Sequence, residues 1–116
     1  MIRLEETPFE LEGKRYVLRC NMAVLESVEE QYGTLDALME VSVRESSLSL
    51  LAAMLNDYAD EQGWEERWTP ARLKRKISYA MLRELDLVGM LFRSVSPSRP
   101  DAAGEAGAGE PADSGN

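Results

Sequence analysis

Two short runs near the start of the chain alternate between apolar and polar residues, with Gly13 between them. The first run spans residues 9–12 and the second spans residues 15–20. Their shared apolar side consists of Phe9, Leu11, Tyr16, Leu18 and Cys20. A period of two on both sides of a glycine turn predicts a β-hairpin with one buried face. Because an isolated hairpin is only marginally stable in water, we expect this one to lie on the helices that follow.

The polar side of this hairpin carries opposite charges on its two strands. Glu10 and Glu12 precede the turn, and Arg15 and Arg19 follow it. Facing side chains of opposite charge stabilise a strand pair, so we expect cross-strand charge pairs here.

The apolar pattern becomes helical after Asn21. Asparagine is a favoured N-cap, and Gly33 offers the left-handed residue that commonly ends a helix. The apolar residues between them gather on about a third of the helical wheel. They are Val24, Leu25, Val28 and Tyr32. The pattern therefore predicts a capped helix between Asn21 and Gly33.

Two further helices are predicted before Gly63. Thr34 is the expected N-cap of a short helix, LDALMEV, and the polar segment 42–47 is expected to be a connector. Ser46 or Ser47 then begins a longer helix that ends at Gly63. Its apolar residues cover more than half of the wheel, which indicates burial on two sides, in the core or partly against a partner. They are Leu48, Leu50, Leu51, Met54, Leu55, Tyr58 and Ala59.

Signals for helix starts recur in the C-terminal part of the chain. Thr69 and Pro70 combine an N-cap with proline at the first helical position, and Leu73 and Ile77 then point inward. Ser78 is a second expected N-cap, because the inward face changes beyond it. That face centres on Met81, Leu85, Val88 and Phe92, with Leu82 and Leu91 beside it. We therefore expect a break or kink near Ser78.

The composition changes abruptly after Ser94. Pro, Gly, Ala and acidic residues dominate, and large apolar side chains are too few to repay the entropy of ordering. We therefore predict a hairpin-plus-helical domain over residues 1–94 and a disordered tail over residues 95–116. The predicted fold class is α+β, mostly α, with the hairpin packed on a bundle of four to five helices.

Charge and composition narrow the classes of function. The formal net charge of −8 argues against nucleic-acid binding, since phosphate contacts depend on clustered Lys and Arg. The chain has no histidine, no Gly-rich phosphate loop, no nucleophile elbow and no CxxC pair, so we predict neither enzymatic activity nor a cofactor. No run is apolar enough for a signal peptide or a membrane span, and a single cysteine allows no internal disulfide. We therefore expect a cytosolic protein with no membrane partner.

Three acidic residues lie near the end of the long predicted helix: Asp57, Asp60 and Glu61. Their spacing is compatible with binding a divalent cation, although a solvated helix face explains them more simply. We therefore predict no metal site.

Cys20 is interpreted as a small buried side chain rather than a reactive thiol.

Basic residues dominate from Arg67 to Arg83, with no acidic residue between them. Arg72, Lys76 and Arg83 lie along one stripe of this section. The stripe is either a docking surface, for an acidic partner or for the acidic half of a neighbouring copy, or a solvated face that balances the domain's own carboxylates.

The tryptophans Trp64 and Trp68 are four residues apart, so one helical turn would bring them together. They are either a hot-spot pair for a partner or a cover for the edge of the core.

A structural motif extends over residues 9–77. It consists of the run FELEGKRYVLRCNMAVLESVEEQYGTLDAL, a long helix rich in Leu and Ala, and the run WTPARLKRKIS. This motif resembles the small tail assembly chaperones of long-tailed bacteriophages and the related proteins of gene transfer agents. Members of this family share the hairpin with its Gly-Lys turn, a helix ending in Tyr-Gly or Phe-Gly, and a Thr-Pro or similar cap before the last helical section.

The resemblance implies a non-catalytic protein of the host bacterial cytoplasm that binds the tape measure protein and promotes assembly of the tail tube. It implies that the protein is absent from the mature virion. It also implies contact with the tail tube protein through a longer frameshift product, and it is compatible with a homo-oligomer. The alternative function is a structural tail-completion or connector component of the virion.

We expect a partner to bind on the long helix and on the last helical section, rather than on the hairpin. The candidate partner-binding residues are Leu51, Met54, Leu55, Tyr58, Trp64, Trp68, Arg72, Lys76, Arg83, Leu85 and Phe92.

Overall fold

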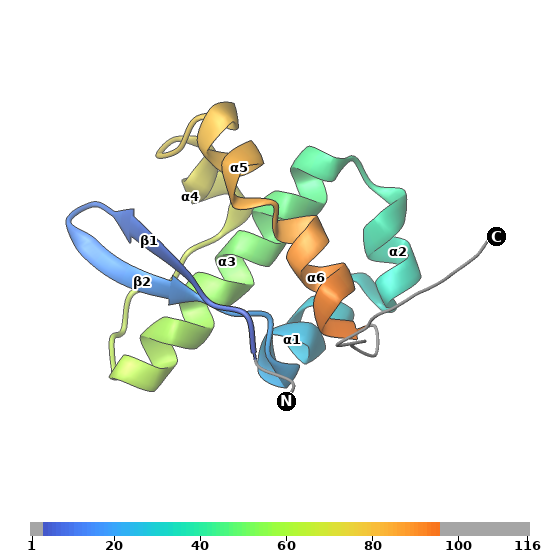
Figure 1. Ribbon diagram of the computed structural model, residues 1–116, viewed down its shortest axis with the longest axis horizontal. Coiled ribbons are helices and arrows are strands. Elements are labelled where there is room, and N and C mark those ends of the chain that lie inside the picture. Colours follow the sequence, from blue (N-terminus) through green and yellow to red (C-terminus); the bar gives the residue numbers. More distant parts are fainter. Residues whose placement is uncertain (1–3, 96–116) are drawn as a thin grey trace, which may run out of the picture.

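The computed structural model describes residues 4–95, which form an α+β, mostly α fold as predicted. The elements are β1 (Thr7–Leu11), β2 (Lys14–Leu18), α1 (Met22–Tyr32), α2 (Leu35–Glu40), α3 (Val43–Gln62), α4 (Pro70–Lys74), α5 (Tyr79–Leu85) and α6 (Leu87–Val95). The strands form an antiparallel hairpin, and the other helices lie around α3 (Figure 1). Of the predicted tail over residues 95–116, only Val95 lies within the described residues, where it ends α6.

The hairpin turns tightly at Glu12 and Gly13. Their φ angles are 51° and 82°, and positive φ at both central residues is the geometry of a type I′ turn. This turn matches the right-handed twist of the strands and sets a register in which Phe9 faces Tyr16. The five alternating apolar residues of the hairpin are all buried, which confirms the predicted inward face.

The charged side chains of the hairpin pair mainly with other parts of the chain rather than across the strands. Glu10 lies opposite Arg15 in the register, but no ion pair joins these side chains in the part of the chain that the structure describes. Arg19 instead pairs with Glu61 on α3. The predicted pairs of Glu10 and Glu12 with Arg15 and Arg19 are therefore wrong, because Glu12 and Arg19 reach partners on the segments packed beside the hairpin. One ion pair does cross the hairpin, between Arg19 and Glu6 at 3.8 Å, just beyond the ends of the two strands.

Helix α1 begins and ends where the sequence predicts. The Oδ1 atom of Asn21 accepts a hydrogen bond from the Val24 N–H at 2.9 Å, and Gly33 has a φ of 89° with its N–H donating to the Glu29 carbonyl. The side-chain Nδ2 atom of Asn21 also donates a hydrogen bond to the Asp57 carboxylate on α3, at 2.8 Å. One asparagine therefore caps α1 and ties its start to α3.

Helix α3 begins at Val43, so the predicted connector over residues 42–47 is wrong. Ser42 is the N-cap, and its Oγ atom accepts a hydrogen bond from the Glu45 N–H at 3.1 Å. The buried Oγ of Ser46 donates to the Ser42 carbonyl at 3.2 Å. Serine hydroxyls that bond back to the preceding turn are tolerated inside a helix, and this allows a polar run to be helical.

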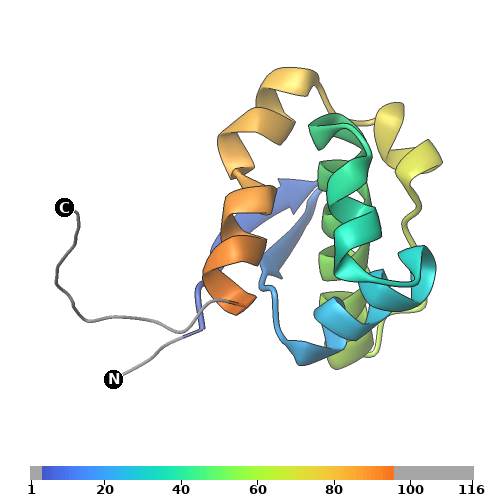
Figure 2. The ribbon, with the colours of Figure 1, turned by 90° about the vertical axis from the view of Figure 1, so that its right-hand side faces the viewer.

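Helix α3 is the centre of the fold and ends at Gly63, as predicted, with a φ of 79°. It contacts β2 and all of the other helices. Figure 2 shows α6 and the hairpin along one side of it. The predicted burial of this helix on more than one side is therefore confirmed, and the elements of the chain itself provide it.

Short capped helices follow α3, again as predicted. The Thr69 hydroxyl accepts from the Arg72 N–H at 3.2 Å, and the Ser78 hydroxyl accepts from the Met81 N–H at 3.2 Å. The expected break near Ser78 is confirmed, since α4 and α5 are separate helices.

A second break, at Asp86, was not predicted. Asp86 has a φ of 50°, and its carboxylate lies where a side chain at position 89 would be, so Gly89 leaves room for it. The left-handed residue rotates α6 relative to α5 and changes which residues face inward. Those buried on α6 are Leu87, Met90 and Leu91. Phe92, which we expected inside, is 52% exposed.

Candidate functional site

Four of the predicted partner-binding residues lie in the core of the chain. They are Leu51, Met54, Leu55 and Trp68, and none is more than 2% exposed. Because neighbouring elements already cover these side chains, they do not form a surface for a partner, and the prediction that these four residues bind a partner is corrected. Tyr58, Trp64 and Leu85 are partly buried against the same core.

The tryptophans meet at Tyr16 rather than at each other. Residues 64–69 have no helical structure, so the two indoles are not brought together by a helical turn. The indole N–H of Trp68 donates to the Tyr16 hydroxyl at 3.2 Å, and the ring of Trp64 meets the Tyr16 ring edge-on with centroids 5.5 Å apart. Both side chains therefore hold the segment 64–69 against the hairpin, and they cover the edge of the core.

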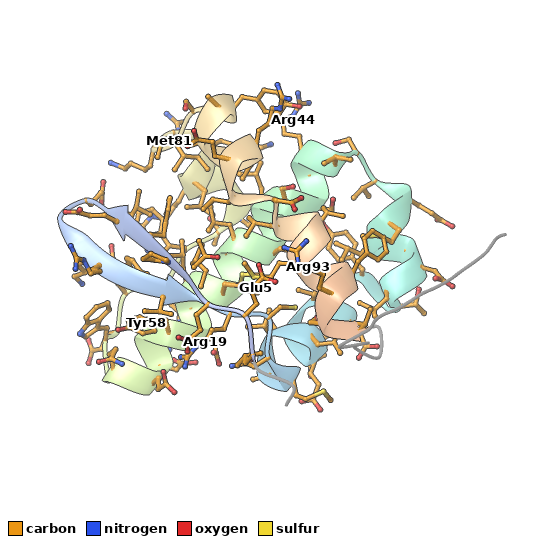
Figure 3. All side chains as sticks on the ribbon, in the orientation of Figure 1. Glu5, Arg19, Arg44, Tyr58, Met81 and Arg93 are labelled. Carbon is orange, nitrogen blue, oxygen red and sulfur yellow. The ribbon has the colours of Figure 1, made fainter. Side chains whose placement is uncertain are left out.

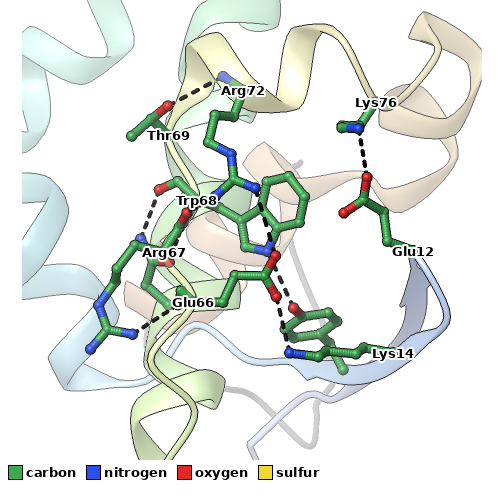
Figure 4. A network of polar contacts seen from close by, with 10 residues as sticks. Glu12, Lys14, Glu66, Arg67, Trp68, Thr69, Arg72 and Lys76 are labelled. Atoms are coloured by element: carbon green, nitrogen blue, oxygen red, sulfur yellow. Dashed lines mark hydrogen bonds and ion pairs between the residues drawn. The ribbon is translucent and has the colours of Figure 1, made fainter.

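The predicted basic stripe is largely balanced by the chain's own carboxylates (Figure 4). Lys76 lies 2.6 Å from a carboxylate oxygen of Glu12, and their hydrogen bond lowers the pKa of Glu12. Arg72 lies 3.6 Å from Glu66, with its guanidinium over the ring of Trp68 at 4.3 Å from the centroid. Two members of the stripe therefore hold α4 and its flanking segments to the rest of the fold.

The acidic cluster on α3 is divided among separate partners. Asp57 accepts from Asn21, Asp60 pairs with Arg67, and Glu61 pairs with Arg19. Within residues 4–95, no group of three or more potential ligands lies together in a way that would hold a metal ion.

Cys20 is buried, and burial raises the pKa of its thiol, an effect only partly opposed by a hydrogen bond from Ser94. Its Sγ atom lies 3.3 Å from the Ser94 hydroxyl. A thiol with a raised pKa stays protonated at neutral pH and is a poor nucleophile.

Among residues 4–95, no helix has the length and apolar character needed to cross a membrane.

A shallow depression of about 200 Å³ lies between the start of α3 and the junction of α5 with α6. Val88 contributes apolar surface to it, whereas Leu82 and Leu87 line it from the core and are only 5% and 1% exposed. Val43 and Tyr79 also line it, and they are 67% and 59% exposed, respectively. Large exposed apolar side chains beside an apolar hollow are typical of a surface that binds another molecule.

Two arginines, Arg44 and Arg83, also line this depression. Neither has a carboxylate within ion-pairing distance among the described residues. Arg83 lies over the ring of Tyr79 at 5.9 Å from the centroid, and Arg44 lies at the edge where α3 approaches α5 (Figure 3). The carboxylate of Asp86, which lines the same hollow, is 3.5 Å from Arg93.

Arg44 lies in an electrostatically unfavourable place. It is in the first turn of α3, where the aligned peptide dipoles create partial positive charge. A cation there costs a few tenths of a kcal/mol to about 1 kcal/mol, whereas Arg83 in the last turn of α5 is at the favourable end of its helix. Arg44 therefore makes no evident contribution to the fold, which favours a role in binding.

No family model, curated protein or solved structure matches the chain. The site is therefore argued from the geometry of this chain alone. We call the depression and its five flanking residues the α3–α5 site: Val43, Arg44, Tyr79, Leu82 and Arg83.

The sequence predicted only Arg83 among the residues of the α3–α5 site. The sequence does not single out Val43 and Arg44, because segment 42–47 has no apolar period and is predicted to be a connector. It also gives no signal for Tyr79. One local signal was present in the sequence. Ser42 is a good N-cap, and a helix that starts there places Val43 and Arg44 in its exposed first turn.

Proposed function

We propose that this protein is a non-catalytic phage tail assembly chaperone, which binds the tape measure protein in the host bacterial cytoplasm and promotes assembly of the tail tube. The observation that carries the proposal is the α3–α5 site, where exposed apolar side chains adjoin two arginines without ion-pair partners. The resemblance of residues 9–77 to this family gives the identity of the client. A longer frameshift product would extend the interaction to the tail tube protein.

In this role the protein would keep its client soluble by covering apolar surface. A tape measure protein is a long helical chain whose apolar surface is exposed until the tube encloses it. A small acidic protein with one apolar binding site can cover part of that surface, and its net charge of −8 keeps the complex soluble.

Co-expression with a tape measure protein encoded in the same genome tests the proposal. We expect the tape measure protein to co-purify with the tagged full-length chain and to precipitate when expressed without it. If the two proteins do not associate and the client is equally soluble alone, the chaperone function is wrong.

Mass spectrometry of purified particles separates this function from the alternative one. A chaperone is absent from the finished virion. Recovery of the chain at a fixed copy number per particle would instead establish a tail-completion or connector component.

A further inference from the structure

We propose that the α3–α5 site binds an acidic amphipathic helix, with an apolar side chain of the helix inserted in the depression and its carboxylates placed against Arg44 and Arg83. The inference rests on the proposed function, which it deepens by naming the surface that is used and the chemistry of the segment that it takes.

The apolar part of the site determines which kind of partner side chain can fill the depression. Val43, Tyr79 and Val88 present accessible apolar surface to the hollow. Leu82 and Leu87 line it from the core and are only 5% and 1% exposed. The volume of about 200 Å³ suits a single large side chain. Leu, Phe or Met on one face of a helix would remove this surface from water, which is the usual mode of helix-in-groove recognition.

The charged part of the site determines whether the partner is acidic or basic. Within residues 4–95, seven basic residues form ion pairs and four do not. Of the four, Arg44 and Arg83 line the same depression, whereas Arg15 and Arg75 lie outside it. The positive end of the α3 dipole lies beside Arg44. An incoming carboxylate would therefore be attracted by a guanidinium and by the helix terminus together, whereas a basic segment would be repelled by both.

The chain's own C-terminal sequence does not meet these requirements. Residues 96–116 contain carboxylates, but they contain no Leu, Ile, Val, Met, Phe, Tyr or Trp to fill the depression. Residues 96–116 therefore do not fill the site, and the occupant that we propose is a helix of another polypeptide. A second copy of the chain would show itself as concentration-dependent self-association that competes with the helix.

Two model helices test the inference without the natural client. Both are synthetic peptides of about five turns with Leu along one face; Glu flanks this face in the first peptide and Lys in the second. Titrated into the ¹⁵N-labelled full-length chain, the Glu peptide should shift the amide signals of Val43, Arg44, Tyr79 and Arg83. The Lys peptide should not shift them.

Charge reversal sharpens the test. In the double variant Arg44→Glu/Arg83→Glu, binding of the Glu peptide should weaken at least about tenfold, and the Lys peptide should bind in its place. Arg15→Glu/Arg75→Glu is the matched control, because it makes the same change in net charge at two exposed arginines that have no ion-pair partner among the described residues and lie outside the depression. The control should bind the Glu peptide as the natural chain does.

Two results would overturn the inference: no shift at the α3–α5 site with the Glu peptide, or equal binding by the natural chain and the charge-reversed variant. The proposed function is decided separately. If the tape measure protein still co-purifies with the charge-reversed variant, the chaperone function stands and this surface is excluded. If it fails to co-purify with the natural chain, the function itself is wrong.

Discussion

Asn56 on α3 binds both backbone polar groups of Trp68. Its Oδ1 atom accepts from the Trp68 N–H at 2.7 Å, and its Nδ2 atom donates to the Trp68 carbonyl at 2.9 Å. The segment 64–69 has no regular secondary structure, so this amide replaces the backbone bonds that a strand or helix would supply. Asn56 thereby fixes the position from which the Trp68 indole reaches Tyr16.

Asn56→Ala should lower the free energy of unfolding by about 2 kcal/mol, because it leaves an N–H and a carbonyl unpaired beside a buried tryptophan. Urea unfolding followed by tryptophan fluorescence measures the change. Gln31→Ala, at an exposed position of α1, is the control and should change stability by less than about 0.5 kcal/mol. Equal stability of the two variants would contradict the role assigned to Asn56.

Leu51→Ala should destabilise the chain by about 2–5 kcal/mol, because the side chain is completely buried at the centre of α3. Leu51→Asp should abolish the fold, so any loss of client binding in that variant would report unfolding. Circular dichroism and thermal denaturation distinguish these effects. Leu4→Ala, where 49% of the residue is exposed, serves as the comparison and should leave the melting temperature almost unchanged.

The left-handed conformation at Asp86 predicts an order of stability between two variants. Both Asp86→Gly and Asp86→Ala lose the contact with Arg93, but only glycine adopts a φ of 50° without steric cost. The glycine variant should therefore be more stable than the alanine variant by about 1 kcal/mol. If alanine were equally stable in urea titrations, α5 and α6 would have to join differently in solution.

The ion pair of Glu5 with Arg93 predicts a dependence on pH. The Arg93 guanidinium donates to both carboxylate oxygens of Glu5, at 2.8 and 2.9 Å, and these bonds lower the pKa of Glu5 below its ordinary value of 4.5. A lowered pKa in the folded state contributes stability above the unfolded pKa. That contribution is lost as the pH falls below 4.5 through the folded value.

Glu5→Gln should therefore cost about 0.2–1 kcal/mol at pH 7, the range for an exposed pair, and less at pH 3, below the unfolded pKa. Chemical denaturation at the two pH values measures the difference. Glu10→Gln is the control, since no ion pair of Glu10 is present in residues 4–95, and it should show no such loss on acidification.

Sequence reasoning succeeded where the decisive interaction is local. Asn21, Thr69 and Ser78 each bind an N–H three residues ahead, so the residue type and the adjacent apolar pattern are enough to predict a helix start. It failed at the start of α3, where Ser42 caps the Glu45 N–H in the same local way, because the polar run that follows shows no apolar period. The buried Ser46 hydroxyl bonds back to the Ser42 carbonyl, and this makes the polar run compatible with a helix.

The candidate site was harder to predict for two physical reasons. An apolar helix face such as that of α3 looks the same in the sequence whether neighbours or a partner cover it, so Leu51 and Met54 were assigned to a surface. Ion pairing also depends on contacts across the fold. The sequence does not reveal that Lys76 meets Glu12 while Arg83 meets no carboxylate among the described residues.

The central position of α3 has a consequence for how the chain loses its structure. Because β2 and each of the other helices contact α3, opening any one of them exposes part of the same shared core. Between residues 4 and 95 we therefore expect a single cooperative transition, without a stable subdomain. The amides of residues 50–55 should exchange hydrogen with solvent only through global opening, so their protection measures the stability of the entire fold.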